Sequence, residues 1–285
     1  MKRKRTKEAP YTGTGNSEKL RPAFAVGNGR SGTHFFQEIM AEDPSIVSCH
    51  IETPEADSFN EYCTWHRLPV DSAAFLETRQ RRIDEAGASG RMYFESNPYL
   101  SLSVSRLNER FDASFIHTIR RPEDVVNSHF VKGWYADPMT RDDARLAPGF
   151  QVGWQTNHFF GRMLPCGEEF ERWSRLTRIG KLAWMWNTVN LRVAEQASSI
   201  PPERYRCVLL DDVDHAVYLE LHAFIGGKQP MSAKQFDRIR DARPGKAKRH
   251  RKPTDWSPEE TREFLNETAP AREKLGIDTR VGSGG

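Results

Sequence analysis

The chain has 285 residues, enough for one large α/β domain or two small ones with a substantial buried core. A hydrophobic content of 37% and a charged content of 28% indicate a globular protein with a very polar surface, and no apolar run approaches the ~20 residues of a membrane span. The formal net charge of +3 is too small to predict general nucleic-acid binding. Four separated cysteines without a C-x-x-C pair argue against a zinc site or a disulfide framework.

The N-terminal segment, residues 1–20, is polar and begins with a basic run at residues 1–7. No hydrophobic segment follows this run, so it does not resemble a secretory signal. We therefore expect residues 1–20 to be a disordered basic tail and residues 21–285 to form a single domain. The dispersed cysteines fit a reducing compartment, and we expect a cytoplasmic protein.

A glycine-rich turn near the N-terminus is the strongest local signal. It follows an apolar run at residues 22–26 and leads into a helical pattern over residues 32–42. A strand, a glycine turn and a helix N-terminus form a cradle for an anion, because the glycines allow close backbone approach and the first helical N–H groups point at the ligand. An ATP-binding loop carries lysine directly after its second glycine, whereas Thr33 follows Gly32 here and Arg30 is the cation of the loop.

Strand and helix patterns alternate through much of the chain, which predicts a parallel sheet with covering helices. Strands are predicted at residues 22–26, within 46–54, and at 92–94, 114–119 and 205–210, and helices at 32–42, 71–86, 100–110, from 122, at 182–197, at 214–225 and from 257.

Two further polar signals stand at predicted strand ends. Arg120 follows the strand at residues 114–119, and Ser128 lies two turns into the next helix, so that a guanidinium and a hydroxyl donor can reach one phosphate. The alternative is a surface arginine pair that caps the sheet edge. Glu95 ends the strand at residues 92–94, at the edge where open α/β sheets place their ligands.

The loop and the Arg120 segment together resemble the nucleotide motifs of sulfotransferases that use 3′-phosphoadenosine 5′-phosphosulfate (PAPS). The sequence G-x-G-R-S-G-T-x-F resembles their 5′-phosphosulfate loop, with His34 in place of the usual second threonine. Arg120 and Ser128 keep the eight-residue separation of their 3′-phosphate motif, although Arg121 replaces the common Asp or Asn. The resemblance spans residues 22 to about 278 and implies a P-loop-NTPase-like three-layer α/β fold, a central parallel sheet flanked by helices.

The resemblance also implies which residues bind PAPS. The basic stretch before the last helix is similar to a K-x-K-G-R loop that covers the nucleotide phosphate, but arginine stands where glycine is expected. No metal is predicted, because arginine and backbone dipoles replace Mg²⁺ and the histidines show no metal-ligand spacing. The expected PAPS ligands are Gly29, Arg30, Ser31, Gly32, Thr33, His34, Arg120, Ser128, Lys246 and Lys248.

Three residues are candidates for the general base. The setting of Glu95 resembles the E-K-[ST]-P-x-Y segment of the heparan-type enzymes, with Ser96 in place of lysine. Glu52, directly before Thr53, resembles the base of the tyrosylprotein enzymes after a one-residue insertion. His50 is the third candidate.

The predicted reaction is sulfuryl transfer from PAPS to a hydroxyl or an amine of a small-molecule, glycan or peptide acceptor, with Arg30 stabilising the transition state. Residues 133–180 are rich in aromatic side chains and are expected to form an acceptor wall or lid. Two other classes stay open. A P-loop kinase or ATPase using Mg-ATP would explain the loop and the Walker-B-like Asp211, and a non-catalytic nucleic-acid-binding protein would explain the basic tail.

Overall fold

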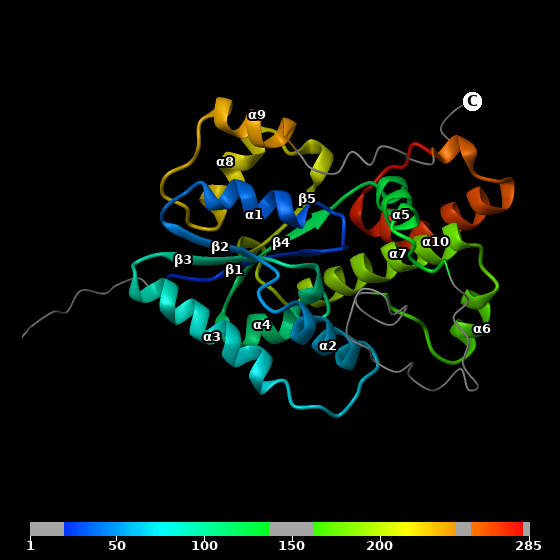
Figure 1. Ribbon diagram of the computed structural model, residues 1–285, viewed down its shortest axis with the longest axis horizontal. Coiled ribbons are helices and arrows are strands. Elements are labelled where there is room, and N and C mark those ends of the chain that lie inside the picture. Colours follow the sequence, from blue (N-terminus) through cyan, green and yellow to red (C-terminus); the bar gives the residue numbers. More distant parts are fainter. Residues whose placement is uncertain (1–19, 137–161, 243–251, 282–285) are drawn as a thin grey trace, which may run out of the picture.

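The structure is a computed structural model that describes residues 20–136, 162–242 and 252–281. One sheet of five strands lies at its centre, with helices on both faces (Figure 1). All the strand pairs are parallel, which confirms the predicted α/β fold class with a central parallel sheet flanked by helices. The strand order is β2-β3-β1-β4-β5, where β1 is Ala23–Gly27, β2 Ile46–His50, β3 Met92–Ser96, β4 Ser114–Ile119 and β5 Tyr205–Leu209.

The α-helices agree with the predicted ranges except at three places. The helices α2, α6 and α9 lie where no helix range was predicted. The buried residues of α2 are mostly polar, so that α2 lacks an apolar stripe, whereas α9 begins with a Ser232–Gln235 capping box that the sequence pattern contains. The helices are α1 (Thr33–Ala41), α2 (Pro54–Trp65), α3 (Ala73–Ala88), α4 (Val104–Phe111), α5 (Pro122–Val131), α6 (Glu168–Ser174), α7 (Arg178–Ala197), α8 (His215–Phe224), α9 (Ala233–Asp241) and α10 (Pro258–Leu275).

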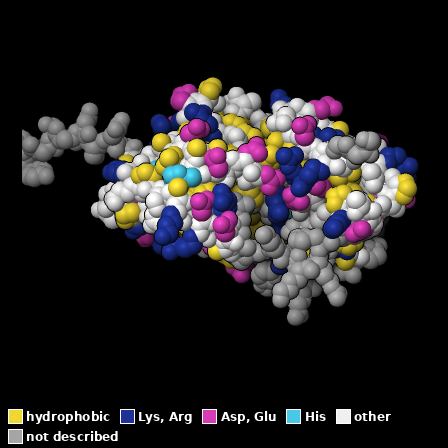
Figure 2. All heavy atoms as spheres, turned by 90° about the horizontal axis from the view of Figure 1, so that it is seen from above, with side chains coloured by type: hydrophobic (Ala, Val, Ile, Leu, Met, Phe, Trp, Pro, Cys, Tyr) yellow, Lys and Arg dark blue, Asp and Glu magenta, His cyan; other side chains and the backbone are white. Residues whose placement is uncertain are grey.

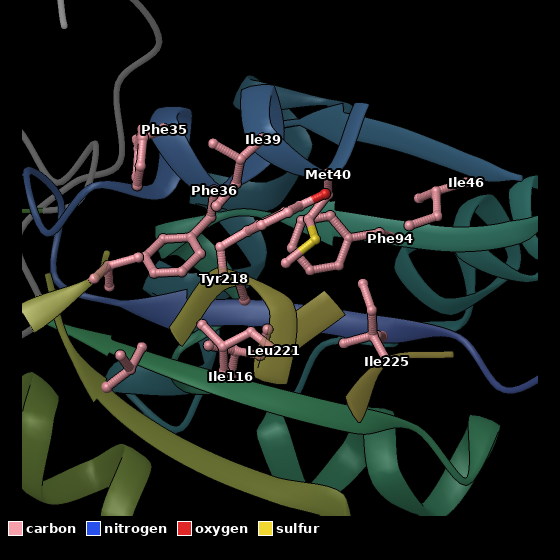
Figure 3. Packing of buried hydrophobic residues seen from close by; sticks show 14 of the residues in the cluster. Phe35, Phe36, Ile39, Met40, Ile46, Phe94, Ile116, Tyr218, Leu221 and Ile225 are labelled. Carbon is pink, nitrogen blue, oxygen red and sulfur yellow. The ribbon is translucent and has the colours of Figure 1, made fainter. Parts of the chain in front are cut away.

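The central strand β1 is apolar at every position because both of its faces are covered. Ala25 contributes to a cluster with residues of α1, α8 and α9, which includes Phe36 and Tyr218 (Figure 3). Phe24 points to the opposite face and packs with residues of α3 and α4. Successive strand residues point to opposite faces, so this alternation fixes the orientation of β1 and of the loop that follows it.

The aromatic residues of the region 133–180 divide between the core and parts that the structure does not describe. Tyr135, Phe170 and Trp173 are buried in a cluster with residues of α7 and α10. Residues 137–161, where most of the predicted acceptor wall falls, lie outside the described residues.

A buried carboxylate, Asp43, joins the end of α1 to the loop between α8 and α9. Its Oδ2 accepts hydrogen bonds from His222 Nε2 at 2.7 Å and from the backbone N–H groups of Lys228 and Gln229 at 2.8 and 2.9 Å. Burial favours the neutral acid, but the hydrogen bonds from Gln229 and Ser45 outweigh it and hold the Asp43 pKa well below its usual range. Asp43 therefore stabilises the fold in its ionised form.

Replacing Asp43 with alanine should lower the free energy of unfolding at pH 7 by ~3 kcal/mol, because the Asp43→Ala change leaves several buried donors without an acceptor. The native pKa is depressed, so the contribution is fully present above the unfolded-state pKa of ~4 and is lost as the pH falls below it. Urea unfolding at pH 7 and pH 3 measures both effects. The exposed Asp241→Ala change is the control, and an equal loss for Asp43→Ala at both pH values would contradict the role of the charge.

Candidate anion-binding and active site

The turn at residues 27–32 is held in place by three other parts of the chain. It leaves the carboxyl end of β1 and enters α1, and each of its anchoring hydrogen bonds comes from an element distant in sequence. The position of the turn is therefore set by tertiary contacts as well as by its own backbone. The anchors are Gly27 N–H to Ser101 Oγ (2.9 Å), Asn28 Nδ2 to the Trp186 carbonyl (3.1 Å) and Ser31 Oγ to Thr118 Oγ1 (2.9 Å).

Two glycines of the turn are required by space. A Cβ on Gly27 would lie 2.2 Å from the carbonyl oxygen of Thr118, and a Cβ on Gly32 would lie 2.7 Å from a methyl group of Leu210. Gly32 also has φ +96°, a conformation that side chains rarely adopt. Arg30 has φ +72° without being glycine, and such backbone strain is often found at binding sites.

The N-terminus of α1 is open toward this turn. Gly32 is the N-cap residue, so no side chain caps the helix, and the first turn carries no acidic residue. The apolar residues Phe36 and Ile39 pack into the core and fix the helix direction (Figure 3). The first N–H groups of a helix lack intrahelical partners and carry the positive end of the dipole. The strand, the glycine turn and the uncapped helix N-terminus therefore follow one another as the sequence predicts, and anion binding by them stays a prediction.

The structure brings Arg30 and Ser128 into direct contact. Gly27 of β1 lies opposite Thr118 of β4, so the segments that leave these two strands start at the same edge of the sheet. Arg30 Nε donates a hydrogen bond to Ser128 Oγ at 2.9 Å, although 98 residues separate them in sequence. The two segments that are predicted to bind phosphate thus lie side by side at one edge of the sheet.

Arg120 stands close enough to Arg30 for the two charges to repel. Burial lowers the pKa of the Arg30 guanidinium, and the charge of Arg120 lowers it further. The Arg120 Nε is buried without a hydrogen bond, and Asp124 Oδ2 lies 3.8 Å away. An anion between the two arginines would remove this repulsion and supply an acceptor.

Two histidines, His34 and His50, lie at the N-terminus of α1. Thr33 Oγ1 is 3.1 Å from His50 Nε2, and the rings of His34 and His50 meet edge to face with centroids 5.2 Å apart. Burial and, secondarily, His34 lower the pKa of His50 to about 4, so His50 is neutral at pH 7. His34 also lies 3.3 Å from Glu38.

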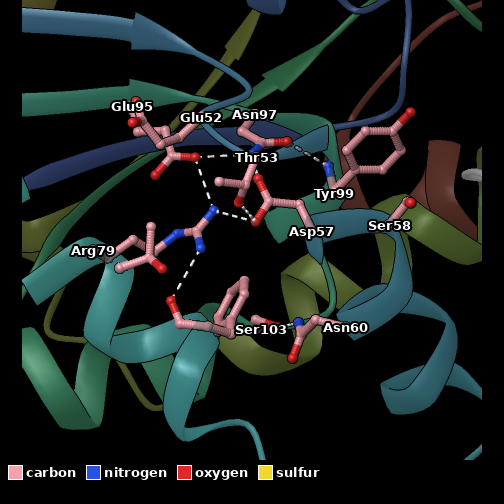
Figure 4. A network of polar contacts seen from close by, with 12 residues as sticks. Glu52, Thr53, Asp57, Ser58, Asn60, Arg79, Glu95, Asn97, Tyr99 and Ser103 are labelled. Atoms are coloured by element: carbon pink, nitrogen blue, oxygen red, sulfur yellow. Dashed lines mark hydrogen bonds and ion pairs between the residues drawn. The ribbon is translucent and has the colours of Figure 1, made fainter. Parts of the chain in front are cut away.

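Glu95 lies in a buried polar network between β3, α2 and α3 (Figure 4). Its Oε1 accepts from Arg79 Nη2 and Asn97 Nδ2, each at 2.9 Å, and its Oε2 accepts from the Tyr93 hydroxyl at 3.1 Å. Arg79 also binds Asp57 at 2.8 Å. Burial raises the pKa of Glu95, and the Arg79 charge opposes that shift.

This network gives Glu95 and Glu52 different access to a substrate. Glu95 is 0% exposed, and both of its carboxylate oxygens already accept hydrogen bonds. Glu52 pairs with Arg82, whose side chain is 43% exposed, and the Glu52 side chain is itself 15% exposed. The sequence did not identify Arg79 as a partner of Glu95, because it is one of several arginines in a charged helix.

Two other buried titratable groups were missed by the sequence analysis. His129 follows Ser128 directly and is 1% exposed, so its position beside a predicted phosphate ligand was the available signal. Glu61 lies on α2, 4% exposed, and its Oε2 makes no hydrogen bond in the part of the chain that the structure describes. Burial and the Asp57 charge raise the pKa of Glu61 to about 8. Burial also raises the pKa of Tyr135, and the charge of Glu61 raises it further.

The remaining predicted site residues have these outcomes. Lys246 and Lys248 lie outside the described residues, as does the basic tail up to residue 19. Asp211, the residue of the Walker-B-like segment, pairs with Arg121 at 3.3 Å. Within residues 20–136, 162–242 and 252–281, no group of three metal-ligating side chains gathers, and no helix is long and apolar enough to cross a membrane.

No protein-family model matches the chain, and no curated protein matches it. Solved structures do match. A sulfotransferase from Alicyclobacillus acidocaldarius is 17% identical with a TM-score of 0.50, covering 90% of this chain and 97% of its own. A sulfotransferase from Mycobacterium avium is 14% identical with a TM-score of 0.54, covering 93% and 79%. The sulfotransferase domain from the curacin biosynthetic pathway is 12% identical with a TM-score of 0.51, covering 91% and 98%. The chain therefore has the P-loop-NTPase-like α/β fold that these sulfotransferases share.

Burial of the Glu61 carboxyl should make the protein less stable as the pH rises. Its native pKa of about 8 lies above the unfolded value of ~4.3, so the stability falls between these two pH values. Glu61→Gln, which cannot ionise, should equal the parent near pH 4 and exceed it by ~2–4 kcal/mol at pH 8.5. Chemical denaturation at both pH values measures this. Glu55→Gln, exposed on the same helix, is the control, and a destabilised Glu61→Gln at pH 8.5 would show that the carboxylate has a partner.

Proposed function

We propose that the protein is a PAPS-dependent sulfotransferase that moves the sulfuryl group to a hydroxyl or an amine of an acceptor. The observation that carries this proposal is the convergence of Arg30, Ser128 and Arg120 at the carboxyl ends of β1 and β4. A single phosphate would need only one such group of donors. This site offers a glycine loop with Arg30 and, next to it, a second cation, Arg120. A nucleotide with anionic groups at both its 5′ and 3′ ends fits such a pair.

The roles follow from the chemistry of each position. The free N–H groups at the start of α1 and the Arg30 guanidinium would hold the 5′-phosphosulfate. Arg120 and Ser128 would hold the 3′-phosphate, which ATP lacks. Lys246 and Lys248 are proposed to cover the nucleotide.

Sulfuryl transfer needs electrostatic help where charge develops. The acceptor oxygen forms a bond to sulfur while the bond from sulfur to the bridging oxygen breaks, and the electron pair stays on the 5′-phosphate of the leaving bisphosphate. Arg30 and the helix N-terminus are fixed in place before reaction, so they stabilise that charge without reorganising. The acceptor proton must pass to a general base.

We assign the base to Glu52 in preference to Glu95. A base must contact the acceptor hydroxyl, and Glu95 is fully buried with both oxygens engaged. Glu52 has a partly exposed carboxylate with an ion pair to the half-exposed Arg82, which an incoming acceptor can displace. We infer that Glu95 instead fixes α3 on the sheet through Arg79.

The kinase and nucleic-acid alternatives receive less support. Asp211, which would hold Mg²⁺ in an ATPase, is paired with Arg121. On the face seen in Figure 2, Lys and Arg side chains are interspersed with Asp and Glu, whereas a nucleic-acid surface carries a basic patch of one sign.

Binding of adenosine 3′,5′-bisphosphate (PAP), the product of the proposed reaction, tests the donor. Without metal, PAP should raise the melting temperature more than ATP does, with or without Mg²⁺. Ser128→Ala and Arg120→Ala should each weaken PAP binding about tenfold or more, because each removes a donor to the 3′-phosphate, and should leave adenosine 5′-phosphate binding nearly unchanged.

Arg204→Ala is the control. It removes a cation that lies far from the site and binds Asn108. A preference for Mg-ATP would indicate a kinase or an ATPase. Tight, steeply salt-dependent binding of RNA or DNA without PAP binding would indicate the nucleic-acid class.

The base assignment is tested by two glutamine variants. Glu52→Gln should lower turnover about 100-fold or more while PAP binding stays within twofold of the parent, since a general base contributes to the chemical step alone. The slow transfer of the sulfuryl group from PAPS to water, measured as PAP release, avoids the need for a known acceptor. Glu95→Gln should mainly lower the melting temperature; a stable Glu95→Gln protein that binds PAP but has no turnover would return the base to Glu95.

A further inference from the structure

A histidine that the proposed reaction has not used lies against the anion loop. His129 is on α5, directly after Ser128, and is 1% exposed. A Cβ placed on Gly29 would be 3.4 Å from His129 Nε2, so the nitrogen edge of the ring faces the residue that precedes Arg30. The imidazole therefore borders the loop itself.

Two contacts define the plane of the His129 ring. The indole of Trp134 stacks on the imidazole with centroids 4.1 Å apart and planes 21° apart. The backbone N–H of Trp134 donates to the His129 carbonyl at 3.1 Å. Gly133, with φ +78°, makes the tight turn that this contact requires. The helix and the turn after it hold the imidazole plane.

Neither ring nitrogen of His129 makes a hydrogen bond in the described part of the chain. Burial, followed by the charges of Arg30 and Arg162, lowers the pKa of His129 to about 3, so the ring is neutral with one N–H donor. A buried donor without an acceptor is rare and costly in folded proteins. Its presence beside a cationic loop indicates a ligand that is an acceptor.

We propose that His129 binds the sulfuryl group that is transferred, donating its ring N–H to a sulfuryl oxygen. This inference rests on the proposed function. Neighbouring residues on a helix point about 100° apart, so Ser128 and His129 face different parts of the ligand. Ser128 contacts Arg30 and is proposed to bind the 3′-phosphate, whereas His129 borders Gly29, at the start of the loop that holds the 5′ end.

A neutral donor suits this position better than another cation. Arg30 already experiences the charge of Arg120, so a further cation would add repulsion before the ligand binds. The imidazole N–H adds a hydrogen bond to the sulfuryl group without adding charge. His129 would then distinguish PAPS from PAP, which lacks that group.

The test compares the dissociation constants of PAPS and PAP, measured by calorimetry in the cold. His129→Phe keeps a ring to stack on Trp134 and removes both nitrogens. We expect PAPS binding to weaken about tenfold, the size of one hydrogen bond to a charged group, and PAP binding to change less than twofold. The melting temperature should stay the same or rise, because an unsatisfied polar group is removed. His129→Gln, which keeps an N–H donor, should recover much of the PAPS affinity and remains informative if the phenylalanine variant does not fold.

His117→Gln is the matched control, because His117 is also buried and neutral but its nitrogens bond Tyr205 at 2.8 Å and Asn190 at 2.9 Å. It should lower the melting temperature and leave the ratio of PAPS to PAP affinity unchanged. Equal weakening of PAPS and PAP in His129→Phe, or no weakening, would overturn the inference. If the parent protein binds neither compound, the proposed function fails, and this outcome is distinct from a failed role of His129.

Discussion

Two arginines that repel each other, Arg30 and Arg120, lie at the centre of the candidate site. Arg30 and Arg120 are brought together because β1 and β4 are neighbouring parallel strands, and the segments after them start at one edge of the sheet. The helix α1 adds the positive end of its dipole at the same place. The anionic ligand that we propose would balance this positive charge.

Buried polar groups behind this edge keep the cradle in position. Ser101 and Thr118 fasten the loop, and Arg79 joins Asp57 of α2 to Glu95 of β3. Both carboxylate oxygens of Glu95 accept hydrogen bonds, whereas Oε2 of Glu61 on α2 accepts none in the described residues.

The sequence predicted what depends on local pattern. The strand β1, its glycine turn and α1 were predicted from apolar periodicity and glycine placement, whereas the phosphate-binding role of Arg120 and Ser128, inferred from their spacing, stays a prediction. The helix α2 was not found, because its buried face is polar and is stabilised by distant partners such as Ser103. Nothing local shows that Arg79 points inward while Arg82 reaches Glu52, since both stand in one run of charged residues and only the packing of α3 on the sheet decides. His129 was missed for the same reason, because Gly29 and Trp134 define its surroundings only after folding.

The most direct measurement of the central claim is the position of the two phosphates of PAP in a crystal of the complex. The account predicts one phosphate at the N-terminus of α1 within hydrogen-bond distance of Arg30, and the other between Arg120 and Ser128. A complex in which the phosphates contact neither arginine, or in which only one of them is held and the other extends into solvent, would contradict it.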